Sequence, residues 1–146
     1  LITALYKKAI KLGTPRLLFS AHGIPLDRIE KGDPYESQVH VSVQKILKKL
    51  AFKDIDYVVC YQSKVGPLKW LEPATDEAIV EACKDGVIPI IVPIAFVSEH
   101  SETLVELDIE YHELAHENNA VGYFRVPTVR THKAFINGLA ELCLSC

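Results

Sequence analysis

The sequence predicts an α/β fold in which helices cover both faces of a four-stranded parallel sheet. Short apolar runs rich in β-branched residues alternate along the chain with longer stretches of helical periodicity. The apolar runs are nearly continuous, as expected for strands that are covered on both faces. We expect right-handed crossovers and one α/β domain over residues 1–146, with no internal repeat or linker.

Each expected element has a local signal. Residues 2–12 form an amphipathic, Lys-bearing stretch that Gly13 ends, and the first strand follows at 16–21. Asp33 can cap a helix over 34–51, with Pro34 at its first position and Glu36 completing a capping box. The second strand is expected at 56–62.

The second half of the chain repeats this alternation. Thr75 can cap a helix over 75–84 that Gly86 ends, and a strand follows at 87–93. The next helix is expected over 101–117, with a buried stripe formed by Leu104, Leu107, Tyr111 and Leu114. A fourth strand at 120–126 and an outer helix at 131–144 complete the pattern.

Composition excludes several classes of protein. The net charge of -3 and the scattered Lys and Arg residues argue against a nucleic-acid partner. The longest apolar run, residues 88–97, is too short for a membrane span and contains two prolines. The 4 cysteines are too few for a secreted disulfide framework, which favours a reducing compartment. Because the chain has no Met and starts at Leu1, we expect a fragment or a processed product.

Histidine and carboxylate residues follow two of the predicted strands. His22 follows the first strand, and His100 and Glu102 follow the third. If the strand order is the flavodoxin-like 2-1-3-4, these ends flank the switch point where α/β sheets bind ligands. A lone loop histidine is as readily held by neighbouring backbone, but a second imidazole and a carboxylate favour a site.

Three glutamates share one face of the predicted 101–117 helix. Glu102, Glu106 and Glu110 are spaced four apart, which fits either an acidic site or a solvated helix face. Imidazole and carboxylate together suit divalent iron, zinc or manganese, but the spacing matches no standard catalytic zinc motif. The loop after the second strand, which holds the chain's only Trp at position 70, is expected to form a rim, although a Trp such as Trp70 belongs to the core more often than it contacts a ligand.

Several motifs in this order and spacing resemble the ferrochelatase family. They are FSAHGIP at 19–25, GDPY at 32–35, QSKVGP at 62–67 with Trp70 and Leu71, PIAFVSEHSETL at 93–104 and ELDIEY at 106–111. The resemblance covers nearly the whole chain. It implies a chelatase fold of two similar domains with a porphyrin between them. This chain would then be the C-terminal half, with the N-terminal domain absent from it.

The resemblance also implies roles for single residues. His22 and Glu102 match the catalytic residues, and the metal would meet His22, Glu102, His100, Glu106 and Glu110. Trp70, Phe96 and Ser63 match substrate-binding positions. Imidazole suits the removal of two pyrrole protons near neutral pH, and a few weak ligands suit iron that must be released. Whether His22 or the Glu102 side delivers the metal stays open.

The implied activity is insertion of ferrous iron into protoporphyrin IX, the terminal step of heme biosynthesis. The implied partners are porphyrin, ferrous iron and the missing domain, with peripheral membrane association. The implied location is the cytoplasm of a bacterium, including the inner membrane surface, or the matrix side in a mitochondrion. No catalytic cofactor is expected. Cys143 and Cys146 with Cys60 and Cys83 do not suggest the four ligands of a [2Fe–2S] cluster.

Two alternatives remain. A relative that metallates coproporphyrin or inserts another metal would share these residues. A non-catalytic carrier of metal or tetrapyrrole on the same fold would need affinity but no proton acceptor, so loss of His22 should spare its binding.

Overall fold

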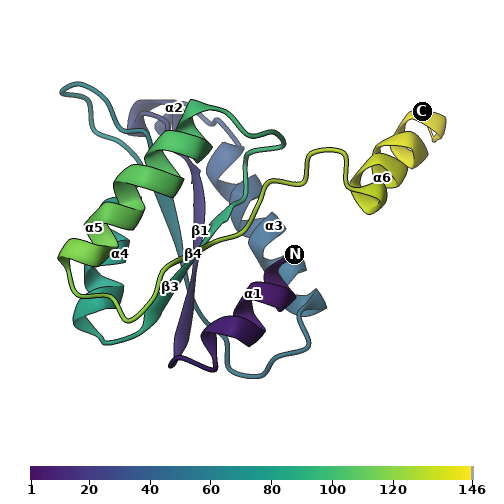
Figure 1. Ribbon diagram of the computed structural model, residues 1–146. Coiled ribbons are helices and arrows are strands. Elements are labelled where there is room, and N and C mark those ends of the chain that lie inside the picture. The colour runs from purple at the N-terminus through teal and green to yellow at the C-terminus, as the bar shows by residue number, and fades with distance from the viewer. Residues whose placement is uncertain (146) are drawn as a thin grey trace.

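The chain folds as a four-stranded, all-parallel sheet in the order β2-β1-β3-β4. Figure 1 shows the sheet between two layers of helices. This computed structural model describes residues 1–145. The strands are β1 (Pro15–His22), β2 (Asp56–Gln62), β3 (Ile88–Pro93) and β4 (Phe124–Arg125). The predicted fold class and the flavodoxin-like strand order are therefore confirmed.

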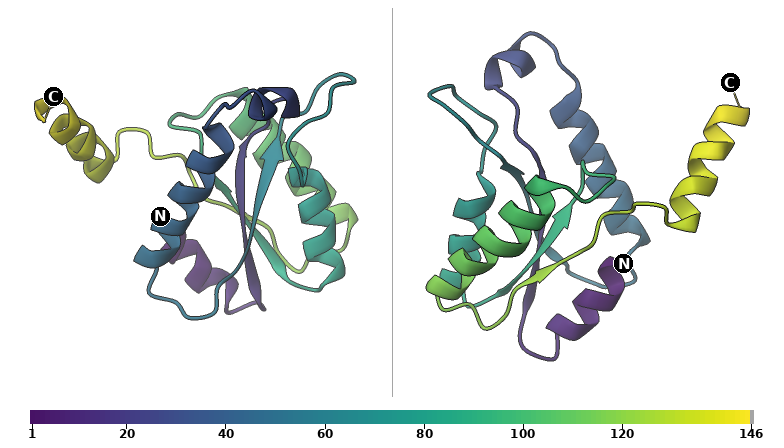
Figure 2. Two further views of the ribbon diagram at one scale, coloured as in Figure 1. Left: turned by 180° about the vertical axis from the view of Figure 1, so that it is seen from behind. Right: turned by 45° about the horizontal axis from the view of Figure 1, so that its top comes forward.

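Helices cover both faces of the sheet, and the two views of Figure 2 show both layers. The helices are α1 (Ile2–Ala9), α2 (Leu26–Glu30), α3 (Tyr35–Lys49), α4 (Thr75–Lys84), the π-helix η1 (Glu102–Glu110), α5 (Tyr111–Glu117) and α6 (Lys133–Leu144). Helices α1 and α3 lie on one face, and α4, η1 and α5 lie on the other (Figure 1). The sequence prediction missed the five-residue α2.

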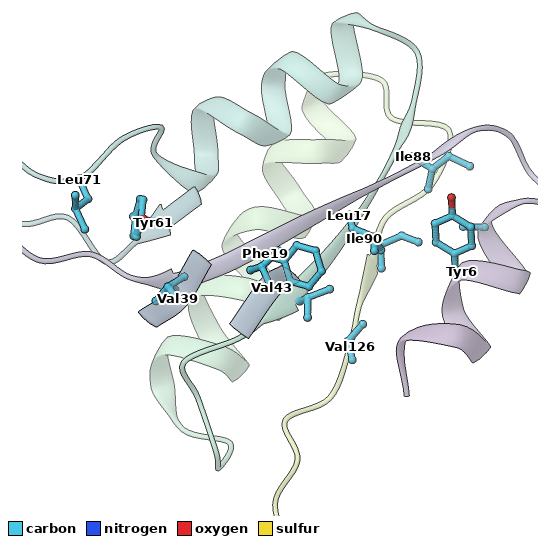
Figure 3. Packing of buried hydrophobic residues seen from close by; sticks show 13 residues of the cluster. Tyr6, Leu17, Phe19, Val39, Val43, Tyr61, Leu71, Ile88, Ile90 and Val126 are labelled. Atoms are coloured by element: carbon cyan, nitrogen blue, oxygen red, sulfur yellow. The ribbon is translucent and has the colours of Figure 1, made fainter. Parts of the chain in front are cut away.

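Each face of the sheet has its own apolar core. Leu17 and Phe19 of β1 and Ile90 of β3 point to the face that α1 and α3 cover. There they belong to one cluster with Val43 of α3 (Figure 3). Leu18, between them in sequence, joins the opposite cluster, whose other members include Cys60, Ile79, Ile91 and Leu107. Successive strand residues point to opposite faces, so near-continuous apolar strands bury side chains on both.

The helix termini differ in part from the predicted caps. Thr75 is not a cap, because α4 is preceded by Ala74 and the Thr75 hydroxyl bonds instead to Ser20 at 2.9 Å. Asp33 does accept a hydrogen bond from the Tyr35 N–H at 2.9 Å, but its own N–H donates to the Arg28 carbonyl rather than to Glu36. The predicted capping box is therefore wrong: α3 begins at Tyr35, and Pro34 precedes the helix instead of taking its first position.

Gly86 ends α4 as predicted, with a φ of +69°. Its N–H donates to the Cys83 carbonyl, and the Val87 N–H donates to the Ala82 carbonyl. These two bonds make a Schellman motif, which requires the left-handed conformation that glycine adopts without strain.

The predicted helix over 101–117 is two helices, with the π-helix η1 leading directly into α5. Leu107 is fully buried, but Leu104 is 47% exposed, so the predicted buried stripe is wrong at Leu104. A π-helix bonds residue i to i+5 and therefore turns side chains away from the positions of an α-helix.

Strand β4 is shorter than the predicted 120–126. The Ala120 N–H still donates to the Ala115 carbonyl, and Asn119 has a φ of +59°, so the chain is leaving α5 at this point. Within residues 120–126, Phe124 and Arg125 are the two that pair with β3.

Helix α6 extends away from the rest of the domain in Figures 1 and 2, and none of its described residues is buried. Within residues 1–145, no helix combines the length and apolar character needed to cross a membrane.

Candidate active site

His22 and Glu102 meet at the carboxyl edge of the sheet. His22 is the last residue of β1, and Glu102 opens the π-helix that follows β3. The His22 Nε2 lies 3.6 Å from the Glu102 Oε2, and the two side chains are 41% and 37% exposed. The prediction that these residues share one edge, on neighbouring strands, is confirmed.

Two hydrogen bonds fix His22 in one orientation. Its Nδ1 lies 2.6 Å from the Gly23 carbonyl oxygen, which can only accept, so Nδ1 carries the proton. The Tyr35 hydroxyl, from α3, donates to the main-chain oxygen of His22 at 2.9 Å. In the neutral imidazole the Nε2 lone pair therefore faces Glu102 and can accept a proton.

Gly23 allows the loops after β1 and β2 to approach closely. Its N–H donates to the Gln62 carbonyl at 2.8 Å. A Cβ at this position would lie 3.0 Å from that carbonyl oxygen and 3.2 Å from the Trp70 ring. The Leu26 N–H also donates to the Lys69 carbonyl at 2.8 Å. A side chain at Gly23 would push these loops apart and move His22.

An open cavity of about 570 Å³ lies in front of the His22–Glu102 pair. Six of the residues predicted from sequence line it: His22, Ser63, Trp70, Glu102, Glu106 and Glu110. The three glutamates thus do share one side, as their spacing predicted. The indole Nε1 of Trp70 is buried and has no hydrogen-bond partner among the described residues.

Phe96 and His100 lie beside this cavity and do not line it. Phe96 is 8% exposed, and its ring centroid lies 6.5 Å from that of His22 and 5.3 Å from that of His100. It lines a separate, mostly apolar cavity of about 360 Å³. The His100 Nδ1 accepts a hydrogen bond from the Glu102 N–H at 3.3 Å, so this imidazole caps the π-helix.

Four hydrogen bonds occupy the carboxylate of Glu106. Ser63 donates from its N–H at 2.8 Å and from its hydroxyl at 2.6 Å, and the Gln62 amide and Tyr111 hydroxyl donate at 3.0 and 2.9 Å. Burial and the charge of Glu106 raise the pKa of Tyr111, so its hydroxyl keeps the proton it donates. Ser63 takes a φ of +63° to make its bonds.

Four of the five residues predicted to meet the metal line this cavity, and two of them are in direct contact. His22 and Glu102 are adjacent, whereas Glu106 bonds to β2 and His100 to the start of the π-helix. Among residues 1–145, no three or more His, Cys, Asp or Glu side chains are arranged to hold a metal ion.

Arg125 supports the site from β4, and the sequence analysis missed it. Its guanidinium bonds to Glu99 at 2.7 Å and to both carboxylate oxygens of Asp108 in the π-helix. Burial opposes ionisation of Glu99, but the bonds from Arg125, Thr103 and the Thr128 N–H lower its pKa to about 2. A lone Arg in an edge strand carries no sequence signal of this role.

The cysteines at positions 60, 83 and 143 are free thiols. Cys60 is buried in β2, and burial raises its pKa to about 12. Cys83 is partly buried in α4, and Cys143 is exposed on α6. Cys146 lies outside the described residues, so the predicted absence of a cluster stays a prediction.

Known proteins match nearly the whole length of this chain. The family model described as ferrochelatase matches residues 2–145. The ferrochelatase of Wolbachia pipientis wMel is 55% identical over 145 residues, which cover 99% of this chain and 45% of that protein. The Pelagibacter ubique ferrochelatase is 51% identical over 138 residues, covering 94% of this chain and 40% of that protein.

A solved structure shares the fold at low identity. It is a CbiX protein of cobalamin (vitamin B12) biosynthesis from Marinobacter aquaeolei, with a TM-score of 0.62 and 11% identity. The match covers 89% of this chain and 94% of that one. The chain spans less than half the length of the curated relatives above. With the family model matched over residues 2–145, the chain belongs to the ferrochelatase family.

Proposed function

We propose that the complete protein inserts ferrous iron into protoporphyrin IX and forms protoheme. The observation that carries this proposal is the His22 Nε2, which faces both the cavity and the Glu102 carboxylate at 3.6 Å. Membership of the ferrochelatase family supports the same reaction.

The proposed role of His22 is to accept the pyrrole protons. Insertion of a divalent ion into a porphyrin releases two N–H protons, which need an acceptor beside the macrocycle. With the Nδ1 proton held by Gly23, the free Nε2 lone pair is that acceptor. The resulting imidazolium faces the Glu102 carboxylate, which stabilises it, and both groups are exposed enough to pass the proton to water.

Ferrous iron is the second substrate. His22 and Glu102 offer one nitrogen and one carboxylate group side by side, and Glu110 adds a carboxylate at the cavity wall. So few ligands would hold iron weakly, which suits an ion that must pass to the four porphyrin nitrogens. The oxygens of Glu106 already accept hydrogen bonds, so we assign this residue to the wall and not to the iron.

A second domain would complete the porphyrin site. Protoporphyrin is a large, mostly apolar disc, and such ligands bind tightly when most of their surface is enclosed. This domain supplies one open cavity, and the chain covers 45% of the Wolbachia pipientis relative. We infer that an N-terminal domain, similar in fold, forms the opposite wall.

Heme formation by the purified complete protein tests the proposal. Ferrous iron and protoporphyrin, mixed without oxygen, should give protoheme at a rate proportional to enzyme concentration. Coproporphyrin and the divalent ions of zinc and cobalt form the comparison panel. Faster metallation of coproporphyrin, or of another ion, would replace the substrate we propose. Porphyrin binding without insertion of any metal would indicate a carrier and contradict the proposal.

A further inference from the structure

Gln62, the last residue of β2, is a buried side chain that joins the sheet to the π-helix. It is 1% exposed and pairs in register with His22 of β1. Its Oε1 accepts a hydrogen bond from the Ser20 hydroxyl at 2.8 Å. Its Nε2 donates to the main-chain oxygen of Glu102 and to the Glu106 carboxylate, both at 3.0 Å.

These hydrogen bonds allow one orientation of the amide. Because the Gln62 Oε1 only accepts, the Ser20 proton points to it, and Thr75 therefore donates to Ser20. Rotating the amide by half a turn would place Oε1 against the Glu102 oxygen and the Glu106 carboxylate. Two contacts between acceptor oxygens, one of them on the buried amide, would oppose that state, so the network fixes the amide.

The amide holds the residue whose carboxylate faces His22. Glu102 is held at its N–H by the exposed His100 at 3.3 Å, and at its carbonyl by the buried Gln62 at 3.0 Å. The carboxylate itself is 37% exposed and lies 3.6 Å from the His22 Nε2. A partly exposed side chain keeps a fixed position only when its backbone is fixed.

We propose that Gln62 is a positioning residue, which sets the Glu102 carboxylate against His22 through the main chain of Glu102. This inference rests on the proposed function. Gln62 is not among the residues that line the cavity, so it acts through Glu102 and does not touch the substrate. Its second bond, to Glu106, holds the next turn of the same helix.

The test uses Gln62→Met in the complete protein, since Met has the same length and makes no such hydrogen bonds. We expect kcat for iron insertion to fall about 10- to 100-fold, as it does when a residue that orients a metal-binding side chain through hydrogen bonds is replaced. The KM for porphyrin should stay within about threefold, because binding contacts are intact. Amide hydrogen exchange across residues 102–107 should become faster.

Two controls separate positioning from general loss of stability. Gln44→Met removes an exposed amide of α3, which donates to the Tyr57 hydroxyl, and should change neither measurement. Val43→Ala weakens the core on the opposite face of the sheet. When compared at the same fraction of folded protein, Val43→Ala should leave both kcat and amide exchange across residues 102–107 unchanged. Gln62→Asn retains an amide that is too short to bridge, and it should lose activity as Gln62→Met does.

Unchanged kcat or unchanged exchange in Gln62→Met would overturn the proposal, as would an equal loss in Val43→Ala. Failure of both Gln62 variants to fold would show a purely structural residue and would also overturn it. If the unaltered protein forms no heme, the proposed function fails by itself. The exchange measurement then still decides whether Gln62 fixes the backbone of Glu102.

Discussion

At the scale of single residues, the site depends on positions where one backbone segment meets another. Gly23 lets the β1 loop lie against the Gln62 carbonyl, and Ser63 takes a left-handed φ to donate twice to Glu106. Backbone in this conformation is costly for a residue other than glycine and is common at functional sites. These two positions bring the loops after β1 and β2 to the cavity.

We predict that Gly23→Ala destabilises the protein by about 1–3 kcal/mol, because the new methyl group meets a carbonyl oxygen and a ring that cannot move freely. Chemical unfolding measures the change. Gly138→Ala is the matched control, since a Cβ there has no atom within 4 Å. In the interior of α6 it should stabilise by about 0.5–1 kcal/mol. Equal effects at both positions would refute the close-approach argument.

Cys60 should be chemically inert in the folded protein. It is fully buried in β2, and burial raises its pKa to about 12, so almost no thiolate forms at neutral pH. Cys143 is exposed on α6. Maleimide treatment followed by peptide mass spectrometry should therefore modify Cys143 and spare Cys60 until the chain is unfolded. Rapid modification of native Cys60 would show that β2 opens readily.

The sequence predicted His22 and Glu102 because both follow strands whose ends must share one edge of a parallel sheet. It did not predict that Phe96 and His100 lie beside this cavity and not in its lining, and the roles predicted for them stay predictions. Both follow β3 as well, and the direction a side chain takes in such a loop depends on tertiary contacts. Here Phe96 turns into the apolar groove and His100 bonds to the π-helix.

At the scale of elements, the π-helix η1 is the part that the sequence could not predict. Spacing of apolar residues indicated a helix over 101–117, but it does not distinguish a π-helix from an α-helix. Contacts from other elements hold the wide turns: Glu106 bonds to the end of β2, Tyr123 donates to the Leu107 carbonyl at 2.6 Å, and Arg125 holds Asp108. The π-helix, the end of β2 and the residues around β4 are therefore joined by hydrogen bonds into one structural unit.

Because of Glu99, the free energy of unfolding should fall in acid. Its pKa is about 2 in the folded protein against an ordinary value of 4.5, because Arg125 and the other donors outweigh the effect of burial. A lowered pKa contributes stability above pH 4.5, and this contribution is lost as the pH falls towards 2. Glu99→Gln should therefore lower the unfolding free energy at pH 7 and flatten its decline between these pH values.

Denaturant unfolding at several pH values measures the effect of Glu99→Gln. Glu117→Gln, which changes an exposed carboxyl group of α5, is the control and should leave the curve unchanged. If the unfolding free energy of Glu99→Gln fell as steeply between pH 4.5 and 2 as that of the unaltered protein, other carboxylates would account for the decline.

At the scale of the whole molecule, two core clusters cover the two faces of the sheet, but one apolar groove stays open. Ile94, Phe96, Val97 and Phe135 are among its lining residues, beside the segment that leads to α6. The order of strands and the layers could be predicted, because connection rules leave few topologies. The place of α6 could not, because an amphipathic pattern does not tell what the apolar side will meet.

We predict that residues 1–146 fold alone but insert no iron. Both faces of the sheet are covered, which favours folding, whereas one open cavity cannot enclose a porphyrin. Circular dichroism should show native helix content, and sedimentation should show self-association through the exposed apolar surface. Iron insertion at a rate comparable with that of the complete protein would place the whole active site within this domain.

The most direct test of the account is the iron-insertion rate of His22→Ala in the complete protein, measured together with porphyrin affinity. Loss of the proton acceptor should lower the rate by at least about 100-fold. Porphyrin affinity should stay within about tenfold, because a base acts on the rate more than on ground-state binding. His40→Ala, at an exposed position of α3, should retain full activity. Near-normal turnover by His22→Ala would show that the proton acceptor lies elsewhere.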